Sequence, residues 1–76
     1  MSATTRQIET LNGLVNEINT IIAEAKTSAN YSKIRRALSG VETVVEKARK
    51  SCDKAAYSTA IGMLLRRIKF VKNYVR

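Results

Sequence analysis

With 76 residues, of which 45% are hydrophobic and 26% charged, the chain has room for one domain with one modest core and does not have the composition of a disordered protein. Its net charge of +8 indicates a polyanionic partner, although charge says nothing about the fold. Histidine is absent and cysteine occurs once, which excludes the common catalytic triads and Cys/His metal clusters. No glycine-rich loop of the kind that binds phosphates is found. We therefore expect that the protein is not an enzyme and uses no metal or cofactor.

The first helix is predicted over about residues 5–27. Its apolar side chains recur every three or four positions, which places them on one face of a helix. This stripe consists of Ile8, Leu11, Leu14, Val15, Ile18, Ile21, Ile22 and Ala25. Thr4 and Gln7 have the spacing of a capping box, so we expect the helix to begin there.

The second helix is predicted over about residues 31–50, with Asn30 as its N-cap. Its main stripe consists of Tyr31, Ile34, Leu38, Val41, Val45 and Cys52. Cys52 lies on the apolar side of the helices at the point where the third helix begins. We therefore expect its thiol to pack in the core as a small hydrophobic group.

The third helix is predicted over about residues 53–75, with Ser51 or Asp53 as its cap. Its apolar arc covers about half of the circumference, as a helix that touches two neighbours requires. The arc consists of Tyr57, Ala60, Ile61, Met63, Leu64, Ile68, Phe70, Val71, Tyr74 and Val75.

Three helices of matched length with short polar connectors and no proline predict an all-α fold, a small up-down-up antiparallel three-helix bundle that forms a single domain. A longer coiled coil is the alternative fold, because the spacings are close to heptads. Gly13, Gly40 and Gly62 fall inside predicted helices, where each glycine costs about 1 kcal/mol relative to alanine. Gly40 lies opposite the apolar stripe and is expected to face solvent or a partner.

Basic residues are concentrated in the second and third helices: residues 1–30 carry two basic and three acidic side chains, whereas residues 31–76 carry twelve and three. Helical periodicity predicts one basic strip on these helices, opposite the apolar stripe. The strip consists of Lys33, Arg36, Lys47, Lys50, Arg66, Lys69 and Arg76. Such a strip attracts phosphates through counterion release. We expect non-specific binding of DNA or RNA, because no tryptophan or aromatic row interleaves with these cations to read bases.

Two other classes of function remain open. The first is an adaptor that docks an acidic protein or an amphipathic helix, for which Met63, Arg67, Phe70 and Tyr74 form a candidate row, unless that row belongs to the core. The second is a cationic membrane-active helix, against which the acidic, asparagine-rich first helix argues. No signal peptide or long apolar run is found, so we expect an intracellular protein, in the cytoplasm, nucleus or nucleoid, or packaged in a particle. The sequence is also compatible with a homo-oligomer.

Overall fold

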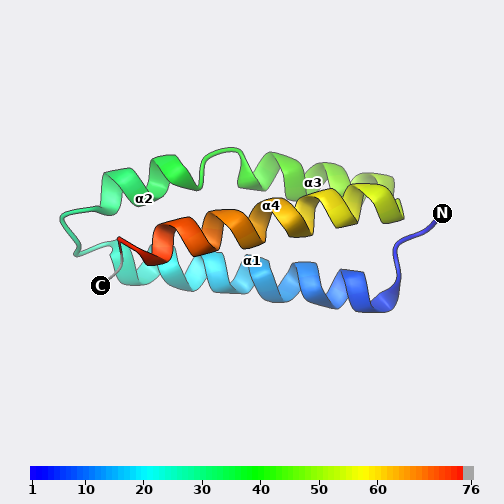
Figure 1. Cartoon of the computed structure of the whole chain (residues 1–76), viewed down its shortest axis with the longest axis horizontal. Helices are drawn as coiled ribbons and strands as arrows, with labels where there is room; N and C mark the ends of the chain where they lie inside the picture. The colour runs from blue at the N-terminus through cyan, green and yellow to red at the C-terminus, as the bar shows by residue number, and fades with distance from the viewer. Residues whose placement is uncertain (75–76) are drawn as a thin grey trace.

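The computed structural model describes residues 1–74 and consists of four helices, α1 (Thr5–Ala25), α2 (Tyr31–Ala37), α3 (Val41–Ser51) and α4 (Lys54–Lys72). Helices α2 and α3 follow one another along a single leg, so the molecule has three antiparallel legs in up-down-up order (Figure 1). The bundle measures 43 × 18 × 16 Å. The predicted all-α three-helix bundle is confirmed.

The N-terminal caps of the two longest helices agree with the sequence patterns. The Thr4 hydroxyl accepts the Gln7 amide (3.1 Å) and the Gln7 side chain accepts the Thr4 amide (3.0 Å), which confirms the capping box of α1. The Asp53 carboxylate accepts two backbone amides of the first turn of α4. Asn30 occupies the N-cap position of α2, but its side chain makes no capping bond there.

The predicted second helix is wrong as one continuous element. Helix α2 ends at Ala37, and α3 begins at Val41 after a turn in which Gly40 adopts a left-handed conformation with φ of +82°. Glycine reaches this conformation without the steric penalty of a Cβ atom. The break escapes the periodicity because the apolar stripe continues across it, with Leu38 and Val41 both buried on the two sides of the turn.

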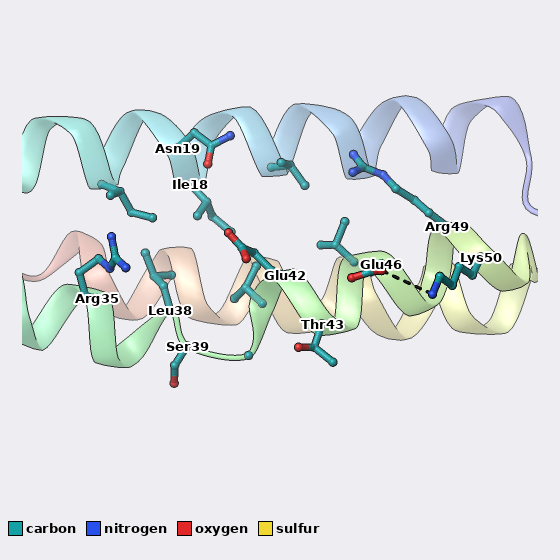
Figure 2. A pocket seen from close by; sticks show the side chains of 15 residues that line it. Ile18, Asn19, Arg35, Leu38, Ser39, Glu42, Thr43, Glu46, Arg49 and Lys50 are labelled. Carbon is teal, nitrogen blue, oxygen red and sulfur yellow. Dashed lines mark ion pairs between the residues drawn. The ribbon is translucent and has the colours of Figure 1, made fainter.

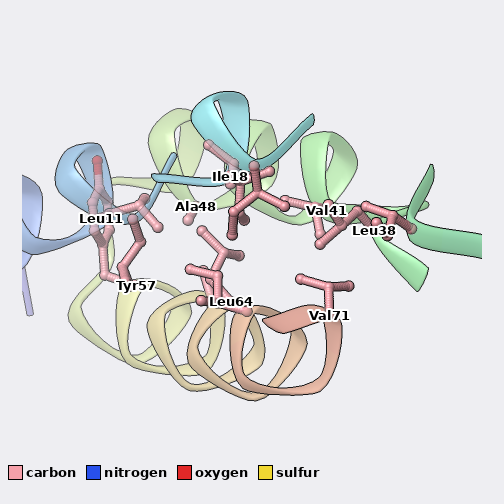
Figure 3. Close-up of a cluster of buried hydrophobic side chains, with 14 of the residues drawn as sticks. Leu11, Ile18, Leu38, Val41, Ala48, Tyr57, Leu64 and Val71 are labelled. Atoms are coloured by element: carbon pink, nitrogen blue, oxygen red, sulfur yellow. The ribbon is translucent and has the colours of Figure 1, made fainter. Parts of the chain in front are cut away.

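The core lies along α4, which packs against both α1 and α3, whereas α1 and α3 make hardly any direct contact. Figure 3 shows side chains from all three legs meeting around Leu64, which is fully buried. The buried set is entirely hydrophobic in the part of the chain described. It consists of Leu11, Leu14, Ile18, Ile21, Ala25, Ile34, Leu38, Val41, Val45, Ala48, Tyr57, Ala60, Leu64, Ile68 and Val71.

Cys52 does not join this core, so the prediction that its thiol packs as a small hydrophobic group is wrong. The residue is exposed and left-handed, with φ of 53°, at the position that ends α3. Its amide still donates to the carbonyl oxygen of Ala48 (3.0 Å). The reversal of chain direction at Cys52 thus turns the side chain out of the stripe that it would occupy if α3 continued.

The N-terminal segment braces this corner between α3 and α4. The amide of Ala3 donates to the Cys52 carbonyl and the amide of Lys54 donates to the Met1 carbonyl, each at 2.8 Å. The amino group of Met1 lies 3.6 Å from Asp53 Oδ1. These contacts hold residues 1–3 against the start of α4.

Candidate nucleic-acid interface

Helices α2 and α4 contain no aspartate or glutamate, and they pack together at one end of the bundle. Two hydrogen bonds set their antiparallel register: Arg67 Nη1 donates to the Ala37 carbonyl, and Asn30 Nδ2 donates to the Tyr74 carbonyl (3.3 Å). In this register, Arg36 lies level with about residue 68 of α4 and Lys33 with about residue 71. The two helices therefore bring their cations together without an acidic residue of their own between them.

Four residues of the predicted basic strip lie at this end of the molecule. Lys33 and Arg36 from α2 and Arg66 and Lys69 from α4 are all exposed. Arg66 and Lys69 are one helical turn apart and lie opposite the buried side of α4. We call these four residues the basic surface.

The other three residues of the predicted strip lie elsewhere. Lys47 and Lys50 are exposed on α3, level with the first turn of α4 and about 14 Å or more along the axis from Arg66. The ammonium group of Lys50 lies 3.5 Å from Glu46 Oε1, one turn earlier. Arg76 lies outside the described residues. The predicted strip is thus spread along the length of the bundle, because α2 and α3 lie beside opposite ends of α4.

The row proposed for a partner protein follows the seam between α2 and α4. Arg67 is half-buried and its guanidinium is occupied by the Ala37 carbonyl, so it ties the two helices together. Met63 and Tyr74 are half-buried, whereas Phe70 is 51% exposed. The rings of Phe70 and Tyr74 meet edge to face, with centroids 5.4 Å apart and planes at 62°. One exposed aromatic side chain, Phe70, therefore follows Arg66 and Lys69 along α4.

Three cations outside the predicted strip are held by neighbours. Lys72 Nζ lies 3.0 Å from Glu17 Oε1 and joins α4 to α1. Arg35 donates to the Tyr31 hydroxyl (3.2 Å), with its guanidinium 5.8 Å from the centre of that ring. Arg49 crosses from α3 to the side-chain oxygen of Asn12 on α1 (2.8 Å). These pairings depend on tertiary contacts, or on local geometry that composition does not reveal.

A groove of about 780 Å³ lies between α1 and the α2–α3 leg (Figure 2). It exists because α1 and α3 hardly touch each other while both pack on α4. Its apolar lining consists of Val15, Ile18, Ile22, Leu38, Val41 and Val45. Glu42, Glu46, Arg49 and Lys50 line it from α3, and Arg35 lines it from α2. This groove could not be predicted from the sequence, because a gap between helices depends on how their axes are placed.

The fold and the surface define a small basic all-α bundle. No protein-family model, curated protein or solved structure matches the chain. Within residues 1–74, no three side chains of the metal-binding types gather as a cluster, and no helix has both the length and the hydropathy to cross a bilayer.

Proposed function

We propose that this protein binds nucleic acid non-specifically, through contacts between the basic surface and the phosphate backbone. The observation that carries the proposal is the packing of two helices without acidic residues, which gathers Lys33, Arg36, Arg66 and Lys69 at one end of the bundle. Backbone contacts of this kind supply affinity and carry no base sequence information. The role is that of an accessory, packaging or regulatory factor.

The lack of ion-pair partners for these four side chains in the described residues supports the proposal. None of them forms an ion pair within the described part of the chain, whereas Lys50 and Lys72 each have a glutamate partner. An unpaired cation attracts a phosphate without first breaking an internal ion pair. Each phosphate neutralised releases counterions, so binding should weaken steeply as salt concentration rises.

The test is the salt dependence of binding to a labelled duplex and to its single strand. The variant Arg36→Glu/Arg66→Glu/Lys69→Glu should lose at least tenfold in affinity, and the slope of log K against log salt should fall by nearly three units for duplex DNA. Arg6→Glu/Lys47→Glu/Lys54→Glu is the matched control, because it changes the net charge equally at exposed positions toward the other end of the bundle. Equal losses in both variants, or no binding by the wild type at low salt, would contradict the proposal.

A second candidate function is the docking of an amphipathic helix from a partner protein, and the groove between α1 and the α2–α3 leg favours it. Its apolar lining is flanked by Glu42 and Glu46, one helical turn apart on α3. The complementary ligand is a helix with an apolar stripe and a basic residue that faces Glu42, because Glu46 already lies 3.5 Å from Lys50 Nζ. Such a helix would occupy the place of a fourth leg.

This second candidate can be tested with a synthetic helix of leucine and lysine of about 14 residues, about 21 Å long. Saturable chemical-shift changes at the groove residues would support it, and they should disappear in Val15→Lys. Val44→Lys is the control, because Val44 is half-buried on α3 but does not line the groove. An equal effect of both substitutions, or no shift changes in the wild type, would contradict groove binding.

A further inference from the structure

Phe70 is the only phenylalanine of the chain, and half of its surface is exposed on α4. Phenylalanine is among the residues most often buried, and a core this small gains much from each aromatic ring. The core instead uses Tyr57 as its buried aromatic residue. The exposure of Phe70 therefore invites a functional explanation from its surroundings.

Phe70 lies at the end of the bundle that carries the basic surface. In the register set by the Arg67 and Asn30 hydrogen bonds, residue 70 lies level with the stretch from Lys33 to Arg36. Arg66 lies one helical turn before it on the same side of α4. All charged side chains of α2 and α4 are basic, so the electrostatic potential around the Phe70 ring is positive.

The geometry of the ring pair leaves aromatic surface free. Phe70 and Tyr74 meet at 62° rather than in a parallel stack. In an edge-to-face pair, each ring keeps at least one face that its partner does not cover. Tyr74 also restricts the motion of Phe70, which lowers the entropy lost when a planar ligand binds.

We infer that Phe70 is a stacking platform for a nucleobase and that the basic surface therefore prefers single-stranded nucleic acid to duplex. Unpaired bases offer a free face to an aromatic ring, whereas bases inside a duplex are already stacked on one another. Lys33, Arg36 and Arg66 would hold the phosphates on either side of the stacked base. This inference rests on the proposed function and adds the class of nucleic acid that the surface takes.

The test compares a single strand of about 15 nucleotides with the duplex made from it and its complement. The wild type should bind the single strand more tightly. Phe70→Leu keeps an apolar side chain but removes the ring, and should weaken single-strand binding by about five- to a hundredfold while leaving duplex binding unchanged. The loss should be the same factor at low and at high salt, because stacking releases no counterions.

Two further variants separate stacking from a merely structural role. Phe70→Tyr retains a ring and should restore single-strand binding. Leu65→Ala is the matched control, because Leu65 is also 51% exposed on α4 but lacks a ring, and it should leave both affinities unchanged. Circular dichroism melting of each variant checks that the bundle remains folded.

The outcomes distinguish this inference from the function on which it rests. Equal binding of both forms by the wild type, with no effect of Phe70→Leu, would overturn the stacking role and leave phosphate binding intact. Equal losses for single strand and duplex in Phe70→Leu would overturn it also, since that pattern indicates a general effect. Failure of the wild type to bind either form would refute the proposed function itself.

Discussion

Helix α1 and the α2–α3 leg have similar sequence patterns but different structures. Each has an unbroken apolar stripe and one glycine near its middle, yet α1 is a single helix of 21 residues and the other leg is divided into helices of 7 and 11. Gly13 is helical, whereas Gly40 is left-handed. The comparison shows that a hydrophobic period fixes which residues are buried without fixing whether the backbone between them is continuous.

The largest effect is expected from the core residue on which α2 depends. Ile34 is the one residue buried within α2, whereas α1 buries five. Ile34→Ala should lower the free energy of unfolding by about 3 kcal/mol, as other deletions of buried methyl groups do. It should also accelerate hydrogen exchange of the α2 amides more than those of α1, because α2 buries no other side chain fully.

Leu11→Ala is the control for this prediction, because Leu11 is equally buried but shares α1 with four other buried residues. Its loss of stability should appear throughout the bundle in the same exchange experiment. If Ile34→Ala accelerates the hydrogen exchange of α1 and α2 amides to the same degree, α2 is not less stable than α1.

The next largest effect is expected at the turn itself. Gly40→Ala should destabilise the bundle by about 1–2 kcal/mol, because alanine pays the steric cost of a left-handed backbone. No atom lies within 4 Å of the Cβ that would be added, so backbone strain is the whole cause. Urea unfolding measures the change, and an unaltered midpoint would show that the turn relaxes at little cost.

Gly13→Ala should have the opposite sign. A Cβ at Gly13 also meets nothing within 4 Å, but the backbone there is helical. Alanine should therefore stabilise the bundle by about 0.5–1 kcal/mol through the lower entropy of its unfolded chain. The same urea experiment gives both values, and a shift in the same direction for the two glycines would remove the contrast between the legs.

The helix caps should show the smallest difference between the two legs. Thr4→Ala removes the capping box of α1 and should cost about 1 kcal/mol. Asn30→Ala removes no capping bond, only the contact with the Tyr74 carbonyl, so thermal unfolding should show a smaller loss. A larger loss for Asn30→Ala would show that the tie between α2 and α4 outweighs the cap.

The sequence predicted most of the fold because burial is periodic and the caps are local. The stripe residues of α1 from Leu11 to Ala25 are buried or half-buried, although Ile8, at the beginning of the same stripe, is 41% exposed. The break at Gly40 and the outward turn of Cys52 depend on single backbone conformations, which a periodic pattern does not contain. Both occur where the chain becomes left-handed.

The candidate site was predicted only in part, for a related reason. Treating residues 31–50 as one helix placed Lys33 and Lys47 in one strip, but Lys33 belongs to α2 and Lys47 to α3, and these two helices lie beside opposite ends of α4. The meeting of Lys33 and Arg36 with Arg66 depends on the register of α2 on α4, which Arg67 and Asn30 fix through bonds to distant carbonyls. Sequence patterns give the face of each helix but not its axial position against another.

The braced corner between α3 and α4 has a practical consequence for experiments on this protein. Cys52 offers a single thiol for a maleimide fluorophore, on a backbone that the N-terminal segment holds in place. The corner lies at the end of the bundle away from the contacts between α2 and α4, so a dye there would leave the basic surface unobstructed. The fluorescence anisotropy of the dye would report the tumbling of the whole molecule. It would therefore rise when the protein binds a much larger nucleic acid.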